Sequence, residues 1–211
     1  MTVSHVLLPL AAYLIGSLSG SLLLGKLRGV DIRTQGSGNA GGTNAFRTQG
    51  AKFALGVLAI DVSKGVLATW LGLAYAPPAG REALPYVCAF AATLGHIWPV
   101  WHGFRGGKGA ATAMGAIGTL WPIALPGLLA LWIASLILTG YVGFSTCLAA
   151  LSFAAAALVV GGDAPRTLFA IAIAALIVFT HRANLMRMRA GTESRFEKAM
   201  LLRRWTRRHG A

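Results

Sequence analysis

Seven apolar segments separated by short polar connections constrain the fold of this chain more than any other feature. The first, residues 3–25, contains no Asp, Glu, Lys or Arg. As an α-helix it would be about 35 Å long, enough to cross the roughly 30 Å hydrocarbon core of a bilayer. No basic region precedes it and the apolar stretch is long, so we expect a membrane span rather than a cleaved signal. The other six segments cover residues 53–75, 84–101, 110–120, 123–139, 141–160 and 167–180.

Composition agrees with a membrane protein. Hydrophobic residues make up 55% of the chain and charged residues 12%, about half the roughly 25% that is usual in soluble domains. Mean hydropathy is +0.64. The 19 Lys and Arg residues against 6 Asp and Glu give a net charge of +13. Because the basic residues lie mostly between and after the apolar segments, we expect membrane lipids or an anionic substrate as partners, and no nucleic acid.

The distribution of Lys and Arg predicts the topology, because these residues accumulate on the cytoplasmic side of a membrane. The connection 26–52 has five basic residues and one acid, 102–109 has two and none, and the tail from residue 181 has nine and two. All three should be cytoplasmic. The balanced connections 76–83 and 161–166 should lie outside. The N-terminus would then be outside and the C-terminus cytoplasmic.

This topology requires an odd number of crossings between residues 109 and 161. Three crossings give seven transmembrane helices, which we favour, whereas one crossing with a re-entrant 110–139 gives five. We therefore expect an all-α, polytopic membrane protein. Residues 1–211 should form a single membrane-embedded domain with a basic cytoplasmic tail at 195–211. From Arg195 to Arg208 the tail could form a surface helix with four residues facing lipid, namely Phe196, Met200, Leu201 and Trp205.

The first predicted cytoplasmic loop has the chemistry of an anion site. Residues 36–47 read GSGNAGGTNAFR. Glycines let backbone amides approach a phosphate closely, and Arg47 can bind one in a bidentate manner. The further side-chain donors are Ser37, Asn39, Thr43 and Asn44. Residues 36–41 match GxGxxG, but without the strand that a dinucleotide site requires. A flexible polar linker is the alternative.

The second loop resembles a phosphate loop without its ATPase parts. Residues 96–109 read HIWPVWHGFRGGKG. His102 stands where a Walker A motif has its first Gly, and Gly109 replaces the Ser or Thr that holds magnesium. Gly106, Gly107 and Gly109 would let the backbone and Lys108 close on a phosphate. The alternative is a tight turn with topological charge.

Two further groups of polar residues accompany the apolar segments. His181 follows the last segment and could bind an oxyanion or accept a proton, although a capping or interfacial role is the alternative. Asp61 and Lys64 lie three residues apart inside the second segment and should pair with each other. Cys88 and Cys147 have no metal or redox spacing. We expect no disulfide, no metal, since no carboxylate cluster or His pair could hold one, and no cofactor.

Together these stretches resemble the bacterial acyl-phosphate:glycerol-3-phosphate acyltransferase family, often called PlsY. The resemblance rests on GSGNAGGTNAFR, DVSKG at 61–65, LGHIWPVWHGFRGGKG, and HRANLMRMRAGTE at the end of the chain. It implies a seven-helix enzyme, which we take to be a monomer, in the bacterial cytoplasmic (inner) membrane, with the active site facing the cytoplasm. The enzyme would transfer a fatty acyl group from acyl phosphate to the sn-1 hydroxyl of glycerol-3-phosphate, giving lysophosphatidic acid in the first step of phospholipid synthesis.

The resemblance also implies which residues act. Four would be catalytic: Ser37, Arg47, Lys108 and His181. Nine would bind substrate: Asn39, Gly41, Thr43, Asn44, Gly106, Gly107, Gly109, Asn184 and Glu193. The segment Tyr141–Thr146 departs from the family because Gly143 stands where a Ser usually follows Val. The His-x4-Asp signature of other glycerolipid acyltransferases is absent, in keeping with a donor other than acyl-CoA.

The implied mechanism needs no acyl-enzyme, because acyl phosphate is an activated mixed anhydride. Positioning and neutralising two anionic substrates is the remaining task. The general base is His181 or the donor's own phosphate, and we favour the phosphate. A transporter of anionic metabolites would need charges and broken helices along a path across the membrane, whereas all glycine-rich motifs lie on one predicted side. A structural scaffold would leave those motifs unexplained.

Overall fold

In the computed structural model, every regular element is a helix across the residues described, which are 3–78, 82–161 and 163–200. Unit 1 comprises residues 1–122 and 163–169, and unit 2 comprises residues 123–162 and 170–211. The two compact units are described separately below. The α-helices are α1 Ser4–Gly16, α2 Gly20–Leu27, α3 Gly42–Gln49, α4 Ala51–Tyr75, α5 Leu84–Ile97, α6 Ala110–Leu120, α7 Ala124–Thr139, α8 Val142–Val160 and α9 Ala164–Arg189. Short 3-10 turns cover η1 Ile32–Thr34, η3 Val100–His102 and η4 Glu197–Ala199.

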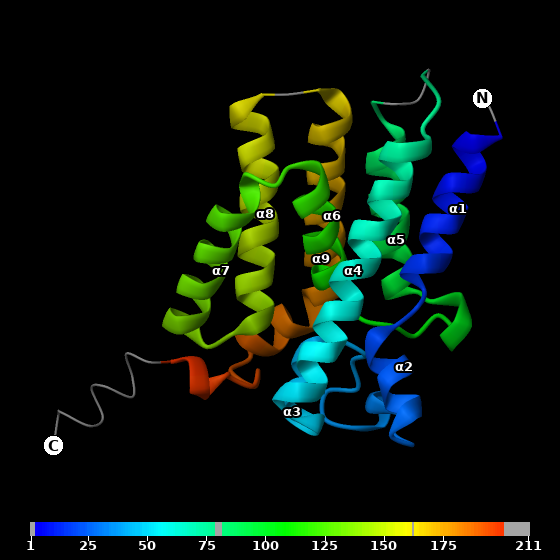
Figure 1. Ribbon diagram of the computed structural model, residues 1–211. Coiled ribbons are helices and arrows are strands. Elements are labelled where there is room, and N and C mark those ends of the chain that lie inside the picture. The colour runs from blue at the N-terminus through cyan, green and yellow to red at the C-terminus, as the bar shows by residue number, and fades with distance from the viewer. Residues whose placement is uncertain (1–2, 79–81, 162, 201–211) are drawn as a thin grey trace, which may run out of the picture. The chain divides into compact units, whose positions relative to one another are not determined.

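Helix α4 is the centre of unit 1. It packs against α1, α5 and α6 and against α2 and α3, which both lie beside its N-terminal end in Figure 1. Glycines allow the close approaches. A Cβ on Gly65 would meet the carbonyl oxygen of Thr112 on α6, and a Cβ on Gly115 would meet that of Val62 on α4. Small residues bring membrane helices together in this way.

Unit 2 is built from α7, α8 and the larger part of α9. Helix α7 packs against α8, and its tryptophan Trp132 donates a hydrogen bond from Nε1 to Oγ1 of Thr146 at 3.1 Å. Phe153 of α8 and Ile173 and Ile177 of α9 are almost completely buried. The first residues of α9, up to Phe169, belong to unit 1.

The predicted all-helical class is confirmed, but helix lengths support only part of the predicted span count. Within the described chain, α4, α8 and α9 are long and apolar enough to cross a bilayer. The pair α1 and α2 makes a fourth candidate if it counts as one bent span. Helices α6 and α7 are apolar but shorter. The seven-span count, the orientation of the termini and the single-domain prediction stay predictions.

Three predicted boundaries are wrong. Residues 3–25 do not form one helix, because α1 and α2 are bent by 45° at residues 17–19. The last helix does not stop at residue 180 but continues to Arg189, so Arg182, Arg187 and Arg189 are helical. The predicted segment 84–101 ends as an α-helix at Ile97, where Trp98 and Pro99 lead into the 3-10 turn η3.

The predicted surface helix of the tail is also corrected where the structure describes it. Residues 197–199 form a 3-10 turn. Met200 is buried rather than turned toward lipid, since it packs on Gly140, where a Cβ would lie 2.7 Å from its sulfur. The amide of Phe196 donates to the carbonyl of Gly140 at 2.7 Å. Leu201, Trp205 and Arg208 lie outside the described residues.

Candidate active site

The break between α1 and α2 is held by charged groups from α4. Asp61 and Lys64 form the predicted ion pair at 2.9 Å. Asp61 Oδ1 accepts a hydrogen bond from the amide of Gly20 at 3.1 Å, and Lys64 Nζ donates to the carbonyl oxygen of Leu18 at 3.0 Å. An unwound stretch between two helices leaves such backbone groups without helical partners. The ion pair therefore stabilises the bend from a neighbouring helix.

The first loop is folded around Asn44, which is the third residue of α3 and buried. Its Oδ1 accepts from the amide of Ser37 at 2.9 Å, and its Nδ2 donates to the carbonyls of Ile32 at 3.1 Å and Gln35 at 3.0 Å. The side-chain amide of Asn44 thus shapes the loop. A phosphate contact by Asn44 stays a prediction.

Glycine is required at one position of this loop. Gly36 has a φ of +56°, a conformation that strains other residues, and a Cβ there would collide with Asn44 Oδ1. The turn leaves Ser37 exposed, while Asn39 and Thr43 are half-buried. Gly41 lies close to the amide of Asn39, since a Cβ there would be 2.6 Å from Nδ2. Arg47 is exposed on α3, one helical turn after Thr43.

The second loop is fastened to His96, the next-to-last residue of α5. The amides of Gly106 and Gly107 donate to the carbonyls of Ile97 and His96, both at 3.1 Å. A Cβ on Gly107 would collide with the His96 ring. Both amides are therefore used inside the protein, and these two glycines permit close packing. Gly109 has a φ of +90° and is the N-cap of α6, directly after the half-buried Lys108.

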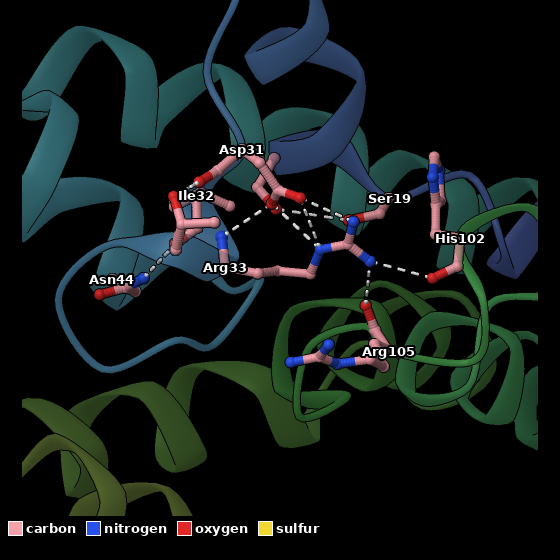
Figure 2. Close-up of polar contacts among 9 residues, drawn as sticks. Ser19, Asp31, Ile32, Arg33, Asn44, His102 and Arg105 are labelled. Atoms are coloured by element: carbon pink, nitrogen blue, oxygen red, sulfur yellow. Dashed lines mark hydrogen bonds and ion pairs between the residues drawn. The ribbon is translucent and has the colours of Figure 1, made fainter.

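Arg33 joins the two loops. Its guanidinium donates to Asp31 at 2.7 to 3.1 Å and through one NH2 group to the carbonyl of His102 at 2.9 Å, with a longer contact to that of Arg105 at 3.4 Å. Figure 2 shows Arg33 between Asp31 and these two carbonyls. We call this group of four residues the Arg33 clamp. It lies in unit 1 and ties the loop that carries Arg47 to the loop that carries Lys108.

The clamp also changes the acidity of its members. Hydrogen bonds from Arg33 lower the pKa of the Asp31 carboxyl, and Asp31 in turn raises the pKa of Arg33. Burial lowers the pKa of His102, and the positive charge of Arg33 lowers it further. At neutral pH the clamp therefore pairs an ionised acid with a guanidinium beside a neutral imidazole.

Unit 2 carries the third group of predicted residues. His181 lies inside α9 and is 6% exposed, so it is not a helix cap. Its Nδ1 is 2.8 Å from the carbonyl oxygen of Ile177. Because a carbonyl only accepts, Nδ1 carries the proton, and Nε2 is the atom that can accept one.

Asn184 and Glu193 lie close together in the same unit. Asn184 Nδ2 donates to Glu193 at 2.6 Å, and Arg187 Nε donates to its other oxygen at 2.7 Å. Glu193 thereby fixes the chain after α9. Asn184 also packs on Gly143, where a Cβ would be 2.9 Å from its Cβ. Gly143 is the residue at which the sequence departs from the family pattern, and its lack of a side chain allows this contact.

Unit 1 therefore brings the first two motifs together, through the Arg33 clamp and through α4. That the third motif shares their site stays a prediction. The sequence interpretation missed three contributors, which are Asp31, Arg33 and His96. Arg33 is one of the five basic residues in the connection 26–52, and its place three positions before Gly36 could have indicated a role beyond topology. The role of His96 depends on contacts that no local pattern shows.

Comparisons with known proteins fit this architecture. A family model described as glycerol-3-phosphate acyltransferase matches residues 6–191. The enzyme of that name from Desulforudis audaxviator is 42% identical over 186 residues, covering 88% of this chain and 92% of the relative. The one from Thermoanaerobacter pseudethanolicus is 38% identical over 191 residues, covering 90% and 94%.

Two solved structures are similar over almost the whole chain. The glycerol 3-phosphate form of PlsY, an integral membrane glycerol 3-phosphate acyltransferase, has a TM-score of 0.86 and 33% identity, covering 94% of this chain and 98% of that one. The lysophosphatidic acid form has a TM-score of 0.84 and 31% identity, with 94% and 99% covered. This chain is thus an integral membrane acyltransferase. It belongs to the glycerol-3-phosphate acyltransferase family.

Proposed function

We propose that this chain transfers a fatty acyl group from acyl phosphate to the sn-1 hydroxyl of glycerol-3-phosphate, giving lysophosphatidic acid and inorganic phosphate. Family membership supports the acceptor, and the two similar PlsY structures carry glycerol 3-phosphate and lysophosphatidic acid in their names. The acyl-phosphate donor rests on the motifs described above. The rival function of a metabolite transporter has no support among these relatives.

The reaction needs little covalent help from the protein. The sn-1 oxygen attacks the carbonyl carbon, the bond between that carbon and the phosphate oxygen breaks, and phosphate leaves with its electron pair. The hydroxyl proton passes to a base. No acyl-enzyme is formed, so the protein contributes positioning and charge neutralisation.

The observation that carries this proposal is the joining of two cationic loops in unit 1. Arg47 lies on α3 and Lys108 two residues before α6, and the Arg33 clamp connects their loops. Both cations would offset repulsion between the phosphates of the two substrates, and Ser37 and Thr43 would orient them. The guanidinium of Arg47 suits a bidentate phosphate contact.

For the base we favour the phosphate of the donor, with His181 binding and orienting a substrate through Nε2. The buried position of His181 and its fixed Nδ1 support a held orientation. Asn184 and Glu193 would assist from the same unit. If His181→Ala abolishes turnover but leaves glycerol-3-phosphate affinity unchanged, His181 is the base instead.

The setting of the reaction is part of the proposal. The chain would be a monomer that crosses the bacterial cytoplasmic membrane seven times, with the N-terminus outside and the motif loops facing the cytoplasm. The one-sided placement of the basic connections supports this orientation.

The test is an assay of the purified protein in lipid nanodiscs with radiolabelled glycerol-3-phosphate and three alternative donors: acyl phosphate, acyl-CoA and acyl-carrier protein. We expect product from acyl phosphate. Activity with acyl-CoA alone would overturn the proposed donor. Arg47→Ala and Lys108→Ala should each lower kcat/KM by about 10²- to 10³-fold, as for loss of a transition-state charge contact. Lys52→Ala is the matched control, because Lys52 is an exposed basic residue five positions after Arg47, in the first turn of α4.

A further inference from the structure

Three ionisable side chains that the proposed mechanism does not use are buried together in unit 1. Asp61, Lys64 and His96 have 1%, 4% and 2% of their surface exposed. Lys64 Nζ lies 2.9 Å from Asp61 Oδ1 and 2.7 Å from His96 Nδ1, and His96 Nδ1 lies 3.4 Å from Asp61 Oδ1. We call these three residues the buried charge cluster.

The ammonium group of Lys64 is saturated. Its three N–H donors match three acceptors, which are Asp61 Oδ1, the Leu18 carbonyl and His96 Nδ1. With Lys64 taken as an ammonium, which has no acceptor, His96 Nδ1 is the accepting atom, and this assigns a neutral ring with its proton on Nε2. One carboxylate and one ammonium then cancel, so the cluster has no net charge. A saturated and neutral group is the form in which ions can persist inside apolar surroundings.

The cluster contacts the support of the first loop. Asp61 holds the amide of Gly20 at 3.1 Å, at the start of α2. The next residue, Ser21, is buried and donates through Oγ to the carbonyl of Ala40 at 2.7 Å. Ala40 directly precedes Gly41 and the helix that carries Arg47. Asp61 is thus connected to the first loop through the hydrogen bond to Gly20, the peptide bond from Gly20 to Ser21, and the hydrogen bond from Ser21 to Ala40.

The cluster contacts the second loop just as closely. The edge of the His96 ring lies so near Gly107 that a Cβ there would collide with it. The His96 carbonyl accepts from the Gly107 amide at 3.1 Å. Gly107 is the residue before Lys108. Lys64 fixes the position of the His96 ring through Nδ1. The ring therefore determines the position of Gly107 and, through it, of the backbone of Lys108.

Stability alone gives a weak reason for such a cluster. Well-packed apolar residues in place of a buried ion pair are often as stable or more stable. A cluster that reaches both cationic loops has another use, because misplacing a catalytic group by about 1 Å can cost about 10²-fold in rate. We propose that Asp61, Lys64 and His96 are positioning residues that set the first loop and Lys108 relative to each other. This inference rests on the proposed function of those loops.

The test uses a variant that removes the link without leaving an unpaired buried ion. Asp61→Asn/Lys64→Met keeps an oxygen for the Gly20 amide and removes both charges, and the methionine at position 64 cannot donate to Leu18 or to His96. Thr69→Val is the matched control, because Thr69 is a fully buried residue of α4 whose hydroxyl donates within its own helix, to the carbonyl of Gly65 at 2.7 Å. His96→Asn, which offers an acceptor near the place of Nδ1, is the conservative variant.

We expect the double variant to unfold within a few degrees of the wild type in a thermal scan. Its kcat should fall about 10²-fold with KM for glycerol-3-phosphate within threefold. Amide hydrogen exchange should rise in residues 36–41 and 104–109 and stay unchanged in Thr69→Val. His96→Asn should retain more of kcat than His96→Leu. The inference is overturned if the double variant keeps kcat within threefold, or if exchange in both loops stays at the wild-type level.

Arg47→Ala, measured in parallel, separates the two proposals. If Arg47→Ala is inactive and the double variant is fully active, the positioning inference fails and the proposed function stands. If Arg47→Ala is fully active, the proposed role of the loops fails. The exchange measurement then still decides whether the buried charge cluster orders them.

Discussion

The side chain of Asn44 serves three backbone groups of the first loop at once. It accepts from the Ser37 amide and donates to the carbonyls of Ile32 and Gln35. Asn44→Ala would leave these groups unsatisfied in a buried place, which should lower the free energy of unfolding by about 1–3 kcal/mol. We expect a lower melting temperature together with lower activity. Asn39→Ala is the comparison, and equal melting of the Asn44 variant and the wild type would show that the loop does not depend on this amide.

His102 gives unit 1 a pH-dependent residue. Its pKa is lowered by burial and by Arg33, and its Nε2 is buried without a partner among the described atoms. Below its ordinary pKa of about 6.5, the unfolded chain binds a proton that the folded chain resists. The contribution of neutral His102 to stability is thus complete above that pH and is lost as the pH falls through the lowered pKa.

The lowered pKa of His102 predicts a measurable difference in thermal stability between the wild type and a variant without this histidine. Between pH 8 and pH 5, the melting temperature of the wild type should fall more than that of His102→Gln, which has no proton to bind. His5→Gln is the control for removing a histidine elsewhere in unit 1. Parallel curves for the wild type and His102→Gln would contradict the assigned cause.

At the scale of elements, Gly65 on α4 and Gly115 on α6 determine how closely these two helices of unit 1 approach each other. A Cβ on Gly115 would overlap the Val62 carbonyl, whereas a Cβ on Gly127 of α7 would meet nothing within 4 Å. Gly115→Ala should cost about 1–3 kcal/mol through overpacking. Gly127→Ala should be neutral or stabilising by up to about 1 kcal/mol, because Ala favours helix. Unfolding by SDS in mixed micelles measures both, and equal effects would refute close packing of α4 and α6.

The sequence predicted some elements closely and others poorly, for physical reasons. The predicted segments 110–120, 123–139 and 141–160 agree with α6, α7 and α8 within one residue, because Gly and Pro delimit them locally. The bend between α1 and α2 lies in the uncharged stretch Ser-Leu-Ser-Gly at residues 17–20, which could have continued as helix. The side chains that stabilise the bend, Asp61 and Lys64, lie on α4, about forty residues away. Long-range partners of this kind leave no local pattern.

The candidate active site, like the helices, was predictable from the sequence only in part. Residue types and spacing were enough to predict cationic, glycine-rich loops, and the Asp61–Lys64 pair is confirmed. The uses of individual groups were not predictable in this way. The amides of Gly106 and Gly107, expected to face a phosphate, bond inside unit 1, and His96 acquires its role only through packing. A motif identifies the chemistry of a site, while contacts between distant segments decide which member performs it.

At the scale of the whole molecule, charge and helix length together limit the possible topologies. The net charge of +13 is concentrated in connections predicted to be cytoplasmic, where it would also attract two anionic substrates to the same side. Helix α6 has only 11 residues, about 17 Å, which is short for a complete crossing. The number of spans therefore depends on whether α6 and α7 cross the membrane separately or form one re-entrant hairpin.

Reporter fusions at one connection decide between these topologies. With seven spans, residues 121–123 lie outside, so alkaline phosphatase inserted there should be active and green fluorescent protein should be dark. With five spans, α6 and α7 return to the cytoplasmic side, and the two signals are reversed. Fusions at residue 140 and at the C-terminus serve as controls, because both positions are cytoplasmic in either case. An active phosphatase at the C-terminus would overturn both topologies, since charge alone would then fail to orient the chain.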